Sequence, residues 1–433
     1  MLRALSYRNY RLFFGGQVVS LVGTWITTTA TNWLVYRLTH SALLLGVVGF
    51  AGQFPAFLLG PVAGIYVDRW NRHRLLVVTQ TVSMLQSFAL AVLTLTGSIT
   101  VHWIIALSIV QGVVNAFDMP GRQAFLLTMI ENRQDLGNAI ALNSSMVNVA
   151  RLVGPSVAGV LIATASEGWC FLIDGVSYIA VIIALLRMRI AKAKPPASAL
   201  HPIQQFREGF AYAFGFPPIR SIILLLALVS LVGVPYSVLM PVFATQIFQG
   251  GPYTLGFLMT ASGCGALLGA LWLAARRSVV GLGRVIPIAS ALFGAGLIAF
   301  ALMRSPRTFW IALPCLTVAG FGFMVQMASS NTVIQTIVDD EKRGRVMSFY
   351  TMAFLGTVPF GSLIAGSLSA RIGAPNTLIL GGLCCLIGAA FFARSLPMLR
   401  TYVRPIYVKL GIIPEVSSGL ATAAELSVPP ERN

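Results

Sequence analysis

The sequence consists largely of apolar runs that are about as long as a membrane is thick. An α-helix needs roughly 20 mostly apolar residues to cross the hydrocarbon core of a bilayer, which is about 30 Å thick. With 56% hydrophobic and only 10% charged residues over 433 positions, the chain cannot bury its apolar side chains in one water-soluble core. The pattern predicts an all-α integral membrane protein with twelve transmembrane helices, at residues 11–37, 42–66, 75–97, 101–119, 139–163, 168–187, 220–247, 254–275, 284–303, 308–330, 346–370 and 376–394.

Lysine and arginine are distributed unequally between the loops that connect these runs. If the amino terminus is cytoplasmic, twenty-five of the thirty basic residues fall on the cytoplasmic side, and Arg151 falls within a run. The remaining four, on the outer side, are Arg37, Arg304, Arg307 and Arg371. This is the positive-inside pattern. It predicts a multi-pass protein of the cytoplasmic (inner) membrane with both termini in the cytoplasm. The net charge of +17 therefore indicates topology and contact with lipid headgroups rather than nucleic-acid binding.

The two halves of the chain repeat one another. Three glycines recur 207 residues later, Gly154 as Gly361, Gly159 as Gly366 and Gly137 as Gly344, while Leu45-Gly46 returns as Leu255-Gly256 at an offset of 210. Duplication of a six-helix unit explains both offsets. We expect one six-helix bundle over residues 1–190, a cytoplasmic linker with an amphipathic helix over 191–219, a second bundle over 220–395 and a cytoplasmic tail over 396–433.

Polar residues follow one face of several of the predicted helices. In the first helix they recur at three- and four-residue spacing, as do Gln111 and Asn115 in the fourth. Such stripes suit the wall of a water-filled cavity, although Ser and Thr also bond back to their own helix or join two helices. We expect a substrate cavity between the two halves, lined by Gln17, Thr24, Thr28, Gln111, Asn115 and Arg151, with Tyr236 and Gln326 opposite.

Three of the ionisable residues inside predicted helices are candidates for a role in function. Arg151 lies near the middle of the fifth, where a charge must face the interior of the bundle; it either contacts substrate or is a structural arginine bonded to backbone carbonyls. Asp174, in the outer half of the sixth helix, is a candidate proton carrier if it is unpaired and a structural strut if it pairs with Arg151. Asp118 is a second candidate proton carrier.

Two charged segments and one glycine-proline run carry a family resemblance. The segments are GIYVDRWNRHR at 64–74 and DDEKRGRVMSFY at 339–350, and the run is ARLVGPSVAG at 150–159. Together with GGQVVSLVGTW and FDMPGRQAFL they resemble the major facilitator superfamily, in the branch that includes enterobactin exporters and related efflux permeases. The second half keeps the arginines of the first charged segment, in AARRSVVGLGR, but lacks its aspartate.

The resemblance implies the major facilitator fold and a role in transport. A central cavity would open alternately to each side of the membrane and export a small amphipathic compound, siderophore-like or drug-like, in exchange for protons. In such a protein the charged segment at 64–74, a hairpin between the second and third helices, docks on the start of the eleventh helix when the cytoplasmic side closes. The helix with the glycine-proline run pivots. The residues that the resemblance assigns to gating are Gly64, Asp68, Arg69, Arg72, Gly154, Pro155, Gly159, Asp340, Arg343 and Arg345.

The sequence argues against several other functions. It contains no glycine-rich loop ending in Gly-Lys-Ser/Thr, which disfavours an ATP-driven pump, and no HExxH motif or nucleophile-base arrangement, which disfavours an enzyme. We expect no cofactor and no metal, and a monomer whose partners are a small-molecule substrate, protons and the lipid bilayer. A gradient-driven importer or symporter of the same fold remains the main alternative, and a membrane sensor or scaffold that transports nothing is the third.

Overall fold

The computed structural model describes residues 3–130, 132, 135–188, 202–276 and 278–413. Regular secondary structure in this part of the chain is entirely helical. The elements are η1 (Arg3–Ser6), α1 (Arg8–Thr39), α2 (Ala42–Arg69), α3 (Arg72–Leu95), α4 (Val101–Met129), α5 (Leu136–Thr164), α6 (Glu167–Leu186), α7 (Pro202–Gly215), α8 (Pro217–Val232), α9 (Tyr236–Val242), η3 (Phe243–Ile247), α10 (Pro252–Ala274), α11 (Leu282–Leu302), η4 (Pro306–Thr308), α12 (Phe309–Ile337), α13 (Asp340–Leu355), α14 (Val358–Ile372) and α15 (Ala374–Lys409).

All twelve predicted spans are present, which confirms the expected fold class. Ten are single helices, the seventh is made of α8, α9 and η3, and the eleventh is made of α13 and α14. Eleven segments of the described chain are long and apolar enough to cross a membrane by length and composition alone. The exception is α1, whose polar stripe lowers its mean hydropathy. The chain is therefore a multi-pass membrane protein.

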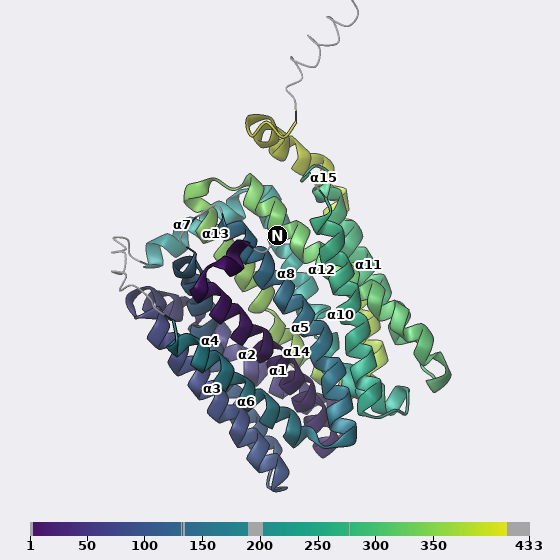
Figure 1. Ribbon diagram of the computed structural model, residues 1–433. Helices are drawn as coiled ribbons and strands as arrows, with labels where there is room; N and C mark the ends of the chain where they lie inside the picture. The colour runs from purple at the N-terminus through teal and green to yellow at the C-terminus, as the bar shows by residue number, and fades with distance from the viewer. Residues whose placement is uncertain (1–2, 131, 133–134, 189–201, 277, 414–433) are drawn as a thin grey trace, which may run out of the picture.

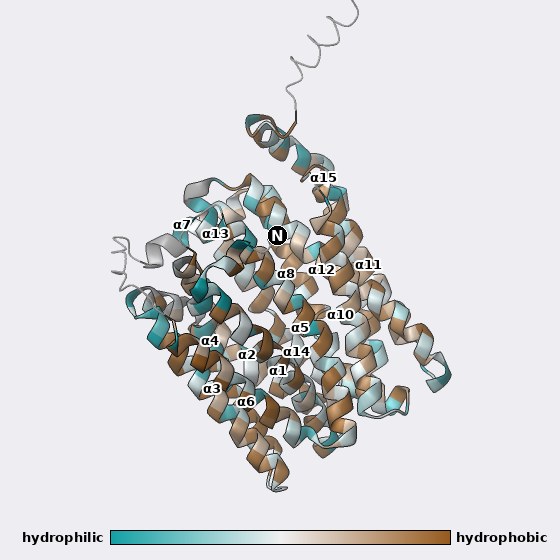
Figure 2. Ribbon diagram, viewed as in Figure 1, coloured by the Kyte–Doolittle hydropathy of each residue, from teal (hydrophilic) through white to brown (hydrophobic). Residues whose placement is uncertain are grey.

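The spans form an N-terminal and a C-terminal group, which lie side by side (Figure 1). In the N-terminal half α1 packs against α5 and α6, while α3 packs against α4 and α6. In the C-terminal half α11 packs between α12 and α15, and α10 packs against α12. Between the halves, α5 lies against α10 and α2 lies against α14. Apolar residues dominate the middle of the bundle, and polar residues gather toward its two ends (Figure 2).

One end of the molecule carries η1, α7, the start of α13 and the end of α15 (Figure 1). We call it the basic end, and we call the opposite end, where α1 meets α2, the distal end. In the N-terminal half, α3 has a clear lipid-facing side. Its residues Val78, Leu85 and Val92 recur every seven residues and are about 60% exposed.

The seventh span is interrupted where the sequence places glycine and proline in mid-membrane. α8 ends at Val232 and α9 begins at Tyr236, and the break contains Gly233 and Pro235. Proline has no backbone N–H, so a hydrogen bond of the helix is lost there. Gly233 allows the ring of Phe293 to pack directly against its backbone.

The twelfth span is longer than its apolar run. α15 continues from the expected boundary near residue 395 to Lys409, and it includes Pro397 and Pro405. The added turns pack against the bundle, because Leu399 is 5% exposed and the ring centroids of Tyr402 and Phe216 are 6.1 Å apart. Residues 396–409, expected to belong to a tail, are thus part of the last helix.

An ion pair joins α1 and α6 at the distal end. The Nε and Nη2 atoms of Arg37 donate to the two carboxylate oxygens of Glu167 at 2.7 and 3.2 Å, and the Glu167 side chain is only 6% exposed. Bidentate pairing of this kind is stronger than a single contact.

We expect Glu167→Gln to destabilise the protein by about 1 kcal/mol, because the substitution removes the charge while leaving Arg37 in place. The melting temperature of the detergent-solubilised protein should fall by a few degrees. The matched control is Arg371→Gln, which removes an exposed arginine at the same end and should leave the melting temperature unchanged. Equal melting temperatures for both variants would show that the Arg37–Glu167 pair contributes nothing.

Candidate transport site

An ion pair between a buried aspartate and a partly exposed arginine lies within the N-terminal half toward the basic end. Asp118 of α4 is 3% exposed, and its Oδ2 lies 2.5 Å from Nε of Arg122, one turn further along the same helix. Its Oδ1 accepts hydrogen bonds of 2.8 Å from both Thr79 and Gln80 on α3. Arg122 also donates to Oε1 of Gln17 on α1, at 2.5 Å. Gln17 and Asp118 are therefore parts of one network that joins three helices.

A second polar group lies further along the same two helices. The Nε2 of Gln111 donates to Oγ of Ser83 on α3 at 3.2 Å and to Oδ1 of Asn115 at 3.1 Å. Gln111 and Asn115, both expected in the cavity wall, thus contact one another, and both are partly exposed.

The polar face of α3 was missed by the sequence analysis, which considered only α1 and α4 as two-sided. Its buried polar residues are Thr79, Gln80, Ser83, Gln86 and Ser87. Three of these, at four-residue intervals, lie on one side of the helix and contact Asp118, Gln111 and Asp174 in turn. The signal was the same three- and four-residue spacing that identified the stripe on α1.

Asp174 is buried without a cation. It is 2% exposed, and its Oδ2 accepts hydrogen bonds from Thr27 of α1 at 2.9 Å and Ser87 of α3 at 2.8 Å. Its Oδ1 has no hydrogen-bond partner and lies against the backbone of Gly23. Among the described residues no basic side chain forms an ion pair with Asp174. The expected alternative, in which Asp174 is a strut paired with Arg151, is not what the structure shows.

Arg151 lies between the two halves. Its guanidinium carbon is 5.7 Å from the ring centroid of Trp25 on α1 and 5.6 Å from that of Phe323 on α12. No described carboxylate forms an ion pair with it, so the aromatic faces are its only described charge-stabilising contacts. A charge at mid-membrane costs at least about 2.5 kcal/mol, which cation–π contacts of about 0.5–2 kcal/mol offset in part.

The face of α5 that carries Arg151 is open toward the basic end. Ile140 is 50% exposed and Val147 38% exposed, and with Ser144 they share the side of the helix on which Arg151 lies. The lipid-facing side is opposite, and its exposed residues are Val149, Val153 and Val160. Since one of the two exposed faces of α5 must face lipid, we interpret the other as facing solvent. Arg151 lies on that face where the two halves come together.

The remaining predicted cavity residues differ in exposure. Thr24 and Thr28 donate to backbone carbonyls one turn earlier, at 3.0 and 2.8 Å, and Thr28 is exposed. In the C-terminal half, Gln326 is fully buried and donates to Ser330 at 3.4 Å. Tyr236 is 4% exposed, and its hydroxyl forms a short hydrogen bond with that of Ser262. Both residues lie within the packing of that half, away from the opening.

The repeated glycines meet one another across the two halves in the distal half of the molecule. A Cβ on Gly159 of α5 would lie 3.0 Å from Cα of Gly256 on α10, and a Cβ on Gly46 of α2 would lie 3.0 Å from Cα of Gly366 on α14. A Cβ on Gly46 would also lie 2.5 Å from the carbonyl oxygen of Ser362, whereas one on Gly159 would fit only if its neighbours shifted by a few tenths of an ångström. The internal duplication therefore produces two equivalent close contacts, one on each side of the interface.

Other contacts extend this closure toward the middle of the membrane. Ser156 of α5 and Thr260 of α10 are joined by a hydrogen bond of 2.6 Å between their hydroxyls. On the other side, the ring of Phe360 on α14 lies 5.6–5.9 Å from those of Phe50, Phe54 and Phe57 on α2. The halves are thus in contact from the distal end to the middle.

The glycine-proline run takes part in packing inside the N-terminal half. Gly154 lies directly against the Cβ atom of Trp25, and Pro155 is buried. Its repeat partner Gly361 lies in the same way against the backbone of α8, at Leu231. The third repeated glycine, Gly137, has open space where its side chain would be, as does Gly344.

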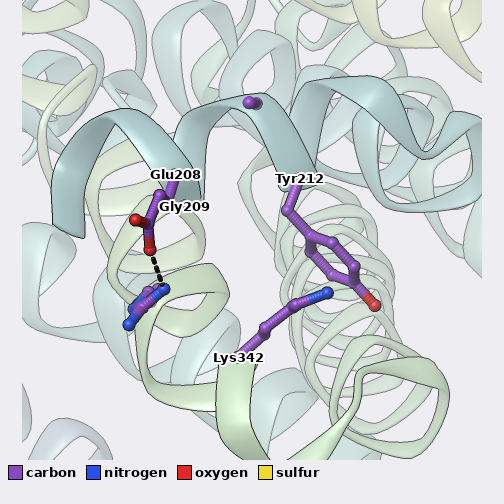
Figure 3. Close-up of a pocket in the computed structure, with 6 residues that line it drawn as sticks. Glu208, Gly209, Tyr212 and Lys342 are labelled. Carbon is purple, nitrogen blue, oxygen red and sulfur yellow. Dashed lines mark hydrogen bonds and ion pairs between the residues drawn. The ribbon is translucent and has the colours of Figure 1, made fainter. Parts of the chain in front are cut away.

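At the basic end, α7 docks on the start of α13 (Figure 3). Arg345 donates to Glu208 at 2.6 Å, and the ammonium nitrogen of Lys342 lies 4.4 Å from the ring centroid of Tyr212. These residues line a pocket of about 420 Å³. The Tyr212 hydroxyl donates to Asp339 at 3.4 Å. Burial and the negative charge of Asp339 raise the pKa of the Tyr212 hydroxyl above its ordinary value.

The hairpin residues expected to dock at this point are only partly described. The side chains of Asp68 and Asp340 lie outside the described residues. Arg69 is exposed, and Arg72 donates to the backbone carbonyl of Ala124 in its own half at 3.4 Å. Gly64 has open space around the position of a side chain, and Arg343 is exposed. The described partner of Arg345 is an acid, Glu208, which belongs to α7.

We expect the Glu208–Arg345 pair to hold α7 in place. Arg345→Glu should increase hydrogen–deuterium exchange of α7, because two like charges then face one another, and the exchanged pair Glu208→Arg with Arg345→Glu should restore protection. Exposed pairs contribute only about 0.2–1 kcal/mol, so the increase should be modest and confined to α7 and the first turn of α13. Unchanged protection in the single variant would mean that the aromatic contacts alone hold α7.

Comparison with known proteins places the chain in a family. The model of the family described as transmembrane secretion effector matches residues 2–402. A staphyloferrin A transporter from Staphylococcus aureus is 28% identical over 90% of this chain and 97% of its own length. A macrolide efflux protein A from Streptococcus pyogenes is 22% identical, over 87% and 94%. A multidrug efflux pump Tap from Mycolicibacterium fortuitum is 26% identical, over 89% and 92%.

Solved structures show the same fold. A bacterial homolog to the human lysosomal transporter Spinster, in an inward-facing and unoccupied conformation, matches 92% of this chain and 98% of its own with a TM-score of 0.70 at 14% identity. A bacterial homologue of the iron transporter ferroportin matches 89% and 98% with a TM-score of 0.68 at 16% identity. The chain belongs to the transmembrane secretion effector family of the major facilitator superfamily, and it is a membrane transporter, not an enzyme.

Proposed function

We propose that the protein exports a small amphipathic compound from the cytoplasm by alternating access, in exchange for protons. Its substrate is siderophore-like or drug-like, its termini are cytoplasmic, and the transporting unit is a monomer. The observation that carries alternating access is the closure of the distal half at two repeat-related glycine contacts while the face of α5 at Arg151 stays open toward the basic end.

The direction of opening follows from the basic residues. The Lys and Arg bias places the basic end in the cytoplasm, so that the conformation is open to the cytoplasm and closed to the outside. An exporter must receive its substrate from this side. The efflux activity named for the macrolide and multidrug relatives supports the same direction.

Proton exchange is assigned to the buried carboxylates of the N-terminal half. Asp174 is the better carrier, because hydroxyl donors are its described partners and no described cation fixes its charge. Asp118 already has a counter-ion in Arg122, so it can take up a proton only when that pair separates. We therefore assign Asp174 to coupling and Asp118 to a conformational change that parts it from Arg122.

The decisive experiment uses everted membrane vesicles, in which respiration acidifies the lumen. A proton-coupled exporter accumulates its substrate in the lumen, and addition of substrate should release protons from it. The panel should include siderophores, dyes and antibiotics, with vesicles lacking the protein as the control. Accumulation only in right-side-out vesicles, driven by an inward proton gradient, would identify an importer. Movement of no compound in either orientation, with ligand-independent solvent access, would favour a sensor or scaffold.

A further inference from the structure

We propose that Arg151 binds an anionic group of the substrate, so that the protein prefers amphipathic acids, carboxylates above all, over cations and neutral compounds. This inference names the substrate class and therefore rests on the proposed transport function. Binding of an amphipathic acid at Arg151 has three requirements. The guanidinium must be accessible, its charge must be uncompensated, and the residues around it must be able to pack against the apolar part of the ligand.

The position of Arg151 meets the first requirement. The residue is partly exposed, and on α5 it follows Ser144 and Val147 along the open face. It lies where the two halves come together, because its backbone carbonyl would be 3.3 Å from a Cβ on Gly263 of α10. A compound that enters from the basic end therefore reaches Arg151 where the opening narrows.

The balance of charge meets the second requirement. Of the other charges that lie away from the ends of the described helices in the N-terminal half, Asp118 and Arg122 neutralise one another, and Asp174 is turned toward α1 and α3. In the C-terminal half, α10 and α12 contain no Asp, Glu, Lys or Arg. Arg151 is thus the one uncompensated cation that the described residues place between the halves. An anion bound there gains a charge-assisted hydrogen bond and removes an unpaired charge from the membrane.

The rings around the guanidinium meet the third requirement. Trp25 comes from the N-terminal half and Phe323 from the C-terminal half, and Phe354 extends the aromatic surface with its ring 6.0 Å from that of Phe323. Arginine that rests on aromatic faces keeps its in-plane N–H donors free for a carboxylate, which they bind in pairs. A ligand held in this way contacts both halves at once, which alternating access requires.

The test compares matched ligands on wild-type protein and three variants. The ligands are aromatic carboxylates, their neutral methyl esters and cationic amines of the same skeleton. The variants are Arg151→Gln, Arg151→Lys and the exposed control Arg371→Gln. Binding is followed by tryptophan fluorescence of the purified protein, with Trp25→Phe to identify the responding residue, and transport is followed by counterflow in proteoliposomes without a proton gradient.

We expect wild-type protein to bind the acids at least about tenfold more tightly than the esters, since a charged hydrogen bond is involved. Arg151→Gln should abolish this preference without weakening ester binding, Arg151→Lys should retain part of it, and Arg371→Gln should match wild type. A wild-type preference for cations or esters, or an unchanged acid preference in Arg151→Gln, overturns the inference. Either result can occur with pH-driven export intact, so failure of this inference is distinguishable from failure of the proposed function, which the vesicle experiment detects.

Discussion

Transport driven by a pH gradient is expected to fall to the level of protein-free vesicles when Asp174 is replaced by asparagine. The amide resembles the protonated carboxyl in shape and can still accept the hydrogen bonds of Thr27 and Ser87, so the three helices around it should stay packed. What it cannot do is release and rebind a proton. Exchange of substrate for substrate, which needs no net proton movement, should therefore continue at close to the wild-type rate.

The two rates should be measured on the same proteoliposome preparation, first with an imposed pH gradient and then as counterflow without one. Asp118→Asn is the informative comparison, because it leaves the partly exposed Arg122 without a carboxylate and should impair both rates together. Ser87→Ala should reduce gradient-driven transport less than Asp174→Asn, since it removes one of two donors to the carboxylate. If Asp174→Asn keeps full gradient-driven transport, Asp174 is not the coupling group.

Much of the fold was predictable because lipid imposes simple requirements on a chain. A span needs about 20 apolar residues, and internal duplication leaves glycines at constant offsets. The repeated glycines also mark close contacts between the halves, because Gly159 lies against Gly256 and Gly46 lies against Gly366. Their constant offsets establish the repeat but do not reveal which copies face one another.

The candidate site was less predictable, because partners far apart in sequence decide what each polar residue does. The stripe on α1 is real, but it serves two purposes. Gln17 belongs to the Arg122 network, while Thr24 and Thr28 bond back to their own helix. The aromatic rings on either side of Arg151 come from α1 and α12, whose positions relative to α5 depend on packing that periodicity cannot supply.

At the basic end, the sequence predicted that the charged residues at the start of α13 form an interface, but it did not predict which segment they contact in this conformation. The acidic and basic residues at the start of α13 were expected to receive the hairpin at Asp68, and their described partners lie on α7, through Glu208 and Tyr212. Docking of the hairpin remains a prediction for the conformation that is closed at this end. In the conformation described, open at the basic end, α7 occupies part of the surface of α13.

The second large effect concerns the glycine contacts at the distal end. Gly159→Leu should disfavour the distal-closed conformation, because its Cβ alone would lie 3.0 Å from both Cα of Gly256 and the carbonyl oxygen of Pro252. Overpacking of this kind costs about 1–3 kcal/mol, which shifts a two-state population by roughly fivefold to somewhat over a hundredfold. Since export requires both conformations in turn, the transport rate should fall by a similar factor.

The matched control is Gly137→Leu on the same helix, where a side chain would meet open space. Both variants remove a glycine from α5, so any general effect on the helix is shared, and only Gly159→Leu adds atoms between the halves. A cysteine at Ser166, next to the distal end of α5, reports accessibility to a membrane-impermeant maleimide. Labelling should rise in Gly159→Leu and stay at the wild-type level in Gly137→Leu. Equal labelling in both, with equal loss of transport, would show that the glycines serve helix packing within each half and that the distal contact is no gate.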